Sequence, residues 1–367
     1  MKSRRIRDFG VVPGRLPAGE KNSIADVPGV RVGHWTCRNE RHQTGVTVVI
    51  PRQQIFLHKC TAAVHVINGY GKSAGLVQIE ELGQLETPVA LTNTLNVGKV
   101  SDALVQYTIG ELEKTGKKLR SLNPVVGECN DASLNEITDR NAGYDQVAEA
   151  IMQASDTFEQ GSVGAGTGMT CHDLKGGIGS ASRIIKIGRN IFTLGVLLLC
   201  NHGNLQDLRV NGKLVGPEIG KRIRAEQKEQ KKAGQEESPA GTSADYSEDV
   251  GSCIIVLATD LPVSSRQLKR ILRRSGVGLA RCGSYWGHGS GDIAIGFTTA
   301  HDIAEDETKS VVSRKMLNER YLEIAFLAAA EACEEAVLNA LAAAEPVKLK
   351  DGSVRRALRE FADLIKE

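Results

Sequence analysis

Short apolar runs recur along the chain and predict β-strands. Several of them are apolar throughout, which is typical of strands whose sheets are covered on both faces. The runs are VTVVI (46–50), AAVHVI (62–67), PVALTNT (88–94), PVVGE (124–128), IFTLGVLLLC (191–200), CIIVLAT (253–259) and DIAIGFTT (292–299). We therefore expect buried sheets at the centre of the molecule.

Helical patterns lie between and after these runs. Ser264 and Ser265, which follow Pro262, predict the start of one helix, and Gly276 predicts its end. The five predicted helices span 99–115, 144–155, 264–275, 320–344 and 353–366. Strands stacked in the middle with helices outside suit this order of elements and indicate a layered fold.

One segment interrupts this alternation. Residues 225–249 contain no Val, Ile, Leu, Met, Phe or Trp, so the segment cannot bury itself and is predicted to be a flexible linker. It ends against Gly251 and Ser252, which lead directly into the apolar run 253–259. A plain surface insertion does not explain so abrupt a junction.

The charge balance excludes several partners. The chain has 46 basic and 44 acidic residues and a formal net charge of +2, so it has no strong field to attract a nucleic acid. No run of eighteen apolar residues predicts a membrane span, and the N-terminal sequence MKSRRIRDFG precedes no apolar signal segment. We expect a soluble, cytoplasmic protein.

The cysteines and histidines predict no metal site. There is no C-x-x-C pair and no HExxH motif, so no metal and no cofactor are expected. The eight cysteines are dispersed and are expected to be reduced and mostly buried: Cys37, Cys60, Cys129, Cys171, Cys200, Cys253, Cys282 and Cys333.

Two glycine-rich stretches do not match nucleotide-binding motifs. The phosphate loop needs a glycine five positions before Gly71 of GYGKSAG (69–75), where Val66 stands. The segment GSVGAGTGMT (161–170) lacks the spacing of a dinucleotide fingerprint, and close backbone packing is its expected role.

Ser252 is the candidate nucleophile. A serine hydroxyl needs a neighbouring base, and the residue's own α-amine can serve once the serine becomes chain-terminal. That amine has a pKa of about 7.7 to 8.0, close to a working pH. Cleavage between Gly251 and Ser252 would release a flexible end and leave the new terminus on a buried strand, which explains the junction.

Six ordered blocks of the sequence resemble the L-aminopeptidase/D-esterase (DmpA-like) family, which includes the β-peptidyl aminopeptidases. Together they extend over nearly the whole chain. The blocks are NSIADVPGVRVGH (22–34), NPVVGECND (123–131), GSVGAGTGM (161–169), LLLCNHGNLQDLRVNG (197–212), VGSCIIVLATDLPVSSRQLKRILRR (250–274) and GLARCGSYWGHGSGDIAIGFTTAH (278–301).

The resemblance implies an α+β fold, a four-layer αββα sandwich like that of the N-terminal-nucleophile hydrolases, formed by one domain over 1–367. It also implies self-cleavage into a larger chain, 1–251, and a smaller chain, 252–367, which remain associated in a tetramer of such pairs. The implied substrates are small peptides, aminoacyl amides or esters.

The resemblance assigns roles to individual residues. Ser252 is the implied nucleophile and Gly251 the end of the larger chain. Ser290 and Asp292 of the GSGD segment are implied to orient the nucleophile and its amine, and Asn201 is implied to stabilise the oxyanion.

The amine-binding motif shows one departure. Glu128 in GECND is the implied anchor for the free amine of the substrate, and the best-known members carry a tyrosine where this chain has Asn130. The amide of asparagine can still donate a hydrogen bond, but its reach and acidity differ from those of a phenol.

Two alternatives to a serine aminopeptidase remain open on the sequence alone. An acyltransferase similar to ornithine acetyltransferase shares the implied fold and self-cleavage, but is expected to carry threonine at the new terminus. An unprocessed binding protein that merely keeps the fold is the other alternative. Each predicted site residue also has a plain structural role open to it, because Gly-Ser-Gly-Asp, for example, is ordinary turn chemistry.

Overall fold

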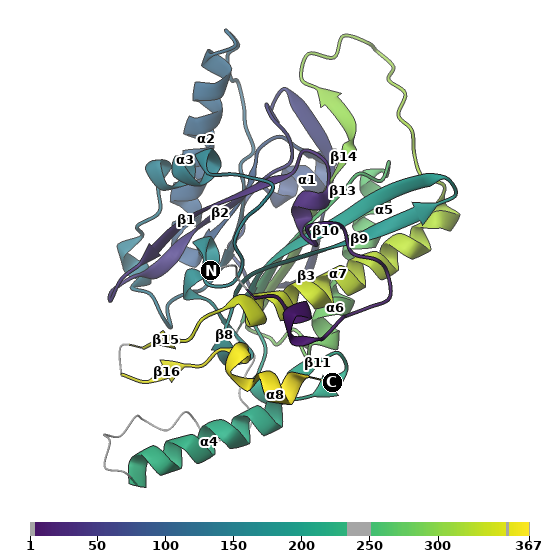
Figure 1. The fold of residues 1–367 in the computed structure, drawn as a ribbon. Coiled ribbons are helices and arrows are strands. Elements are labelled where there is room, and N and C mark those ends of the chain that lie inside the picture. The colour runs from purple at the N-terminus through teal and green to yellow at the C-terminus, as the bar shows by residue number, and fades with distance from the viewer. Residues whose placement is uncertain (1–3, 233–250, 350–351, 367) are drawn as a thin grey trace.

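The computed structural model describes residues 4–232, 251–349 and 352–366. Two sheets lie face to face at its centre (Figure 1). The four-stranded sheet has the order β1 (Arg31–Arg38), β2 (Gln43–Ile50), β5 (Val89–Asn93) and β6 (Val125–Cys129). The six-stranded sheet has the order β4 (Gln84–Leu85), β3 (His58–Gly69), β14 (Gly291–Ala304), β13 (Ser252–Thr259), β10 (Asn190–Asn201) and β9 (Gly177–Ile187).

Helices cover the outer face of each sheet. The four-stranded sheet packs against α2 (Val97–Glu113) and α3 (Tyr144–Met152). The six-stranded sheet packs against α5 (Ser265–Leu272), α6 (Ser275–Arg281) and α7 (Leu322–Ala343). A third apolar cluster fills the space between the two sheets. These four layers confirm the predicted α+β, αββα architecture.

The remaining elements are short or peripheral. They include three two-stranded ribbons, β7 (Thr170–Cys171) with β8 (Leu174–Lys175), β11 (Arg209–Val210) with β12 (Lys213–Leu214), and β15 (Val347–Lys348) with β16 (Val354–Arg355). The helices α1 (Leu76–Leu82), α4 (Gly216–Lys232) and α8 (Ala362–Ile365) complete the set, and α4 projects from the body in Figure 1.

All seven predicted strands are present, and four of the five predicted helices are present with shifted ends. Ser264 caps α5 as predicted, because its hydroxyl accepts from the backbone N–H of Gln267. The predicted end at Gly276 is wrong: α5 ends at Leu272, and Gly276 lies inside α6.

The predicted helix 353–366 is wrong over its first half. Residues Val354–Arg355 form β16, and only Ala362–Ile365 are α-helical. The backbone carbonyl of Arg356 accepts a hydrogen bond from the backbone N–H of Lys175, which draws this segment onto another part of the chain.

The predicted linker 225–249 is wrong at its start. Residues up to Lys232 belong to α4, and the rest of the segment lies outside the described residues. Residues 225–232 consist of strong helix formers (Ala, Glu, Gln and Lys), which continue a helix that Ile219 anchors by complete burial.

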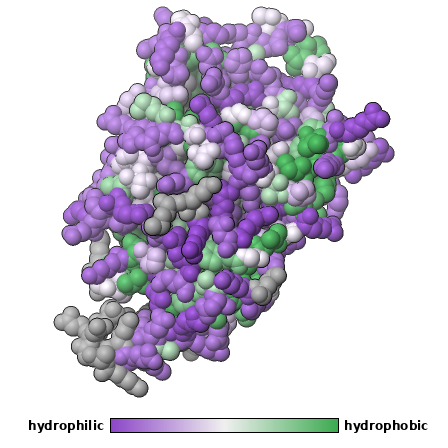
Figure 2. All heavy atoms as spheres, in the orientation of Figure 1, coloured by the Kyte–Doolittle hydropathy of each residue, from purple (hydrophilic) through white to green (hydrophobic). Residues whose placement is uncertain are grey.

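The cysteine prediction is confirmed. All eight thiols are free, and seven of them are buried. On the molecular face shown in Figure 2, hydrophilic side chains predominate and apolar ones are scattered between them. Among the helices that the structure describes, none is both long enough and apolar enough to cross a lipid bilayer.

Candidate active site

Ser252 is the first residue of β13 and lies between two other predicted site segments. It pairs with Asn201 on the antiparallel strand β10 and with Gly291 on the parallel strand β14. The residue is only 6% exposed. Its hydroxyl donates a hydrogen bond to the backbone carbonyl of Gly251, with an O–O distance of 2.7 Å. The nucleophile candidate therefore touches the peptide group that self-cleavage would break.

The carbonyl of Gly251 receives a second donor. The backbone N–H of Gly291 donates to it over 3.2 Å. A β-carbon added to Gly251 would lie 2.5 Å from the carbonyl oxygen of Asn201 and 2.5 Å from the Cα of His202. Only glycine fits this position without a shift of the backbone, since real Cβ contacts are not that short.

Asn201 holds its side-chain amide in a fixed orientation. Its Oδ1 accepts from the backbone N–H of Thr170 over 2.8 Å. Its Nδ2 donates to the backbone carbonyl of Asn130 over 3.1 Å. An amide nitrogen carries two N–H groups, so one of them is left to donate to another acceptor.

Ser290 and Asp292 flank Gly291 and are both buried. Ser290 is 1% exposed, and its hydroxyl has no hydrogen-bond partner in the described parts of the chain. Asp292 is 0% exposed and pairs with Cys253 across the two strands. Burial raises the pKa of Cys253 to about 12, and the negative charge of Asp292 contributes to the rise. A buried carboxylate thus lies next to the strand that begins with Ser252.

Glu128 is the next-to-last residue of strand β6 and is 3% exposed. Its carboxylate accepts from the backbone N–H of Lys72 over 2.8 Å and from the hydroxyl of Thr94. Within the described part of the chain, no Lys, Arg or His side chain forms an ion pair with it. A carboxylate so placed is free to bind a substrate ammonium group.

The turn at Gly71 lies between Glu128 and the start of strand β14. A β-carbon at Gly71 would lie 3.5 Å from Oε1 of Glu128 and 3.8 Å from the Cα of Gly291. The segment GYGKSAG, which the sequence excluded as a phosphate loop, therefore has a different role: it turns the Lys72 N–H onto Glu128.

A cleft of about 610 Å³ opens over these residues. Three of the predicted site residues line it: Asn130, Asn201 and Gly251. The side chain of Asn130 is exposed, and its Oδ1 accepts from the backbone N–H of Ala132. The other four predicted residues, Glu128, Ser252, Ser290 and Asp292, are buried and do not line the cleft.

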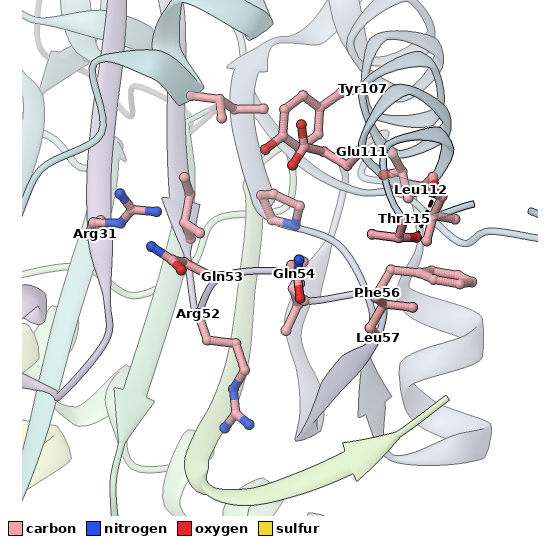
Figure 3. Close-up of a pocket in the computed structure, with 15 residues that line it drawn as sticks. Arg31, Arg52, Gln53, Gln54, Phe56, Leu57, Tyr107, Glu111, Leu112 and Thr115 are labelled. Carbon is pink, nitrogen blue, oxygen red and sulfur yellow. Dashed lines mark hydrogen bonds between the residues drawn. The ribbon is translucent and has the colours of Figure 1, made fainter. Parts of the chain in front are cut away.

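A second cavity, of about 300 Å³, lies elsewhere (Figure 3). Side chains of Tyr107 and Glu111 from α2 and Gln53 from the loop after β2 surround it. It adjoins Pro88, at the start of β5, whereas Glu128 stands at the end of the neighbouring parallel strand β6. None of the predicted site residues lines this cavity.

Sequence reasoning missed Lys175, a buried lysine behind the site. Its ammonium group donates to the backbone carbonyls of Gly166, Met169 and Gly176 over 2.9 to 3.1 Å. Burial lowers the pKa of Lys175 to about 7. Met169 precedes Thr170, so Lys175 holds the segment whose N–H orients Asn201. The sequence around Lys175 gives no sign of this role, because all its hydrogen-bond partners are backbone atoms.

The close packing predicted for GSVGAGTGMT is confirmed. Its 3₁₀ turn Gly164–Gly168 is buried. A β-carbon at Gly166 would lie 2.5 Å from the backbone nitrogen of Ile178, and one at Gly168 would lie 2.2 Å from the carbonyl oxygen of Gln43.

Comparison with known proteins supports the family seen in the sequence. The sequence model of peptidase family S58 matches residues 22–355. The chain belongs to this family. It is also 35% identical to the β-peptidyl aminopeptidase BapA of Sphingosinicella xenopeptidilytica over 357 residues, which covers 93% of this chain and 85% of that protein.

Solved structures agree with the S58 assignment. A β-aminopeptidase of a Burkholderia species has a TM-score of 0.86 and 37% identity, with 99% of this chain and 98% of that chain covered. The L-aminopeptidase D-Ala-esterase/amidase of Ochrobactrum anthropi, described as a new variant among the Ntn hydrolase fold, has a TM-score of 0.84 and 32% identity, with 98% and 99% covered. The predicted family and the predicted hydrolase of the aminopeptidase class are confirmed.

We expect Lys175→Met to lower both the melting temperature and the turnover number. The substitution removes one donor from each of three buried carbonyls. Those of Gly166 and Met169 keep a backbone N–H donor, but that of Gly176 loses the ammonium group, and an unsatisfied buried group costs about 1–3 kcal/mol. Lys186→Met, an exposed position on β9, is the control and should change neither. Thermal unfolding and steady-state kinetics measure both effects. Wild-type stability in Lys175→Met would show that the ammonium group does not hold this segment.

Proposed function

We propose that this S58 chain cleaves itself between Gly251 and Ser252 and then acts as an aminopeptidase with Ser252 as its nucleophile. The observation that carries the proposal is the pair of donors on the Gly251 carbonyl, the Ser252 hydroxyl and the Gly291 N–H. A carbonyl held by a backbone N–H is polarised toward attack, and the attacking oxygen is already in contact with the same group.

Self-cleavage follows from this geometry in two steps. Oγ of Ser252 attacks the carbonyl carbon of Gly251, and the hydroxyl proton passes to the leaving nitrogen, which becomes the α-amine of Ser252. The resulting ester between Gly251 and Oγ is then hydrolysed by water, which yields the Gly251 carboxylate and the free hydroxyl. During the first step the Gly291 N–H stabilises the oxyanion.

The freed amine supplies the base for turnover. With a pKa of about 7.7 to 8.0 it can accept the hydroxyl proton near neutral pH. The remaining N–H of Asn201 donates to the oxyanion of the substrate. Asp292, acting through Ser290, stabilises the protonated amine in the way that a triad carboxylate supports its histidine.

The substrate class rests on Glu128 and on the relatives. A carboxylate that has only neutral donors as partners can bind the free ammonium group of a small peptide, aminoacyl amide or aminoacyl ester. One relative is a β-peptidyl aminopeptidase, and another is an aminopeptidase and esterase/amidase. Asn130, at the rim of the cleft, is proposed to contact the same end of the substrate.

The two chains, 1–251 and 252–367, are proposed to stay together after cleavage. Strands β13 and β14 follow the cleaved bond, and they pair with β10 and β3, which precede it. Their sheet therefore belongs to both chains. By resemblance to the family, we propose a tetramer of such pairs in the cytoplasm. No observation favours the acyltransferase or the unprocessed binding protein over the peptidase.

Purified protein is expected to consist of two chains, of 251 and 116 residues (367 minus 251). Ser252→Ala removes the attacking oxygen and should leave a single chain of full mass. Ser133→Ala, which alters another serine of the cleft, should mature normally. Intact-mass spectrometry distinguishes these outcomes. Cleavage of purified Ser252→Ala at the same bond would rule out self-processing.

Substrates are expected to require a free amino terminus. A charge-assisted hydrogen bond to Glu128 is worth about 1.5–3 kcal/mol, so Glu128→Gln should lower kcat/KM by about 10- to 100-fold, and N-acetylation of the substrate should have at least as large an effect.

Glu86→Gln is the matched control for Glu128. It changes a buried carboxylate that pairs with Lys59 and lies before β5, away from the cleft. Acetylated and free substrates should differ in the control as they do in the wild type. Equal rates for acetylated and free substrates in the wild type would show that Glu128 has only a structural role.

A further inference from the structure

Five potential metal ligands gather on the side of the six-stranded sheet that faces α7. Cys200 and Cys253 are direct cross-strand partners on β10 and β13, and His202 lies two residues beyond Cys200. Cys171 and His172 come from the segment of β7. We call these five residues the thiol–imidazole cluster. All of them are buried.

The ligand atoms of the cluster lie close together. Those of Cys200, His202 and Cys253 are all within 4.8 Å of one another, and so are those of Cys171, His172 and His202. The imidazole of His202 is shared by both triads. In a tetrahedral zinc site with bonds of about 2.0–2.3 Å, neighbouring ligand atoms are about 3.3–3.8 Å apart. Within each triad, shifts of about 1–1.5 Å therefore bring the ligand atoms to the spacing of a zinc site.

The imidazole of His202 indicates independently that the cluster can take up a ligand. Its side chain is 2% exposed and its ring packs edge-on against that of His172, but among the residues that the structure describes neither ring nitrogen has a hydrogen-bond partner. A buried imidazole whose nitrogens form no hydrogen bond is costly, because both nitrogens have lost water.

The thiols are equally unused by the proposed peptidase chemistry. Cys200 is in hydrogen-bonding contact with both Cys171 and Cys253. Thiols bind metal ions as thiolates, so binding at the cluster would release their protons. Three thiols and one imidazole form a donor set that suits soft, thiophilic ions and does not suit Mg²⁺ or Ca²⁺.

We propose that Cys200, His202 and Cys253 bind a single Zn²⁺ ion, and that the thiol of Cys171, which contacts Cys200, moves toward this triad to become the fourth ligand. The site is structural, because it has four protein ligands and no open position for water. The sequence predicted no metal, since the ligands come from three separate segments and form no spaced motif.

The position of the site connects it with the nucleophile. Cys253 follows Ser252, and Cys200 precedes Asn201, which pairs with Ser252. A metal ion that bridges the two thiols would join β10 and β13 one residue from the proposed nucleophile and oxyanion donor. The bound form is therefore expected to have a higher melting temperature than the metal-free form.

Titration with Co²⁺ tests the proposal directly, because cobalt bound by thiolates has intense charge-transfer bands and tetrahedral d–d bands. The full-length protein, stripped with a chelator and kept reduced with a phosphine, is expected to bind one Co²⁺ per chain. Zn²⁺ should bleach these bands by displacement, and it should raise the melting temperature. Elemental analysis of the untreated protein gives the occupancy on purification.

Two variants remove ligands, and one serves as the control. His202→Phe and Cys200→Ala should each weaken binding by more than the 10- to 100-fold that loss of an outer-shell partner costs. Cys333→Ala changes a thiol of the same core that is equally buried but outside the cluster, and it should titrate like the wild type. Absence of charge-transfer bands in the wild type, or unchanged titration in both ligand variants, would overturn the proposal.

Discussion

The position of β13 in its sheet is the constraint on which the rest of the site depends. This strand has an antiparallel neighbour on one side and a parallel neighbour on the other, and both ladders begin at Ser252. Since side chains alternate along a strand, a slip of one residue would turn the serine to the other face of the sheet. The register therefore fixes the relative positions of the Ser252 hydroxyl, the Asn201 amide and the Gly291 N–H together.

Backbone groups and glycine residues form many of the contacts in this site. Four backbone groups each contact a proposed site residue: the Gly251 carbonyl, the Gly291 N–H, the Thr170 N–H and the Lys72 N–H. At Gly251 and Gly291 this close approach requires glycine. A β-carbon at Gly291, for example, would lie 2.6 Å from the carbonyl oxygen of Tyr70.

The sequence predicted the buried strands well because their apolar runs are long and nearly unbroken. Strand β9 escaped detection because its segment GIGSAS is small and polar. In the structure, a β-carbon at Gly179 would lie 1.8 Å from the carbonyl oxygen of Ala336, so close contact with α7 selects glycine there. A signal of this kind depends on a helix more than 150 residues away in the chain and is invisible to a local pattern.

The predicted site residues came from the junction before β13 and from the family blocks, and the structure brings several of them together around Ser252. Lys175 and the thiol–imidazole cluster could not be predicted, because their contacts are to backbone atoms or join segments distant in sequence. Ser252, once terminal, is proposed to carry the acyl group of the substrate during turnover. To test this role, the enzyme is mixed with an aminoacyl ester, quenched in acid and digested. Mass spectrometry then locates the acyl group. We predict a hydroxylamine-labile acyl group on the peptide that begins with Ser252. An acyl group on another residue, or on a peptide that still runs through Gly251 and Ser252, would contradict the account.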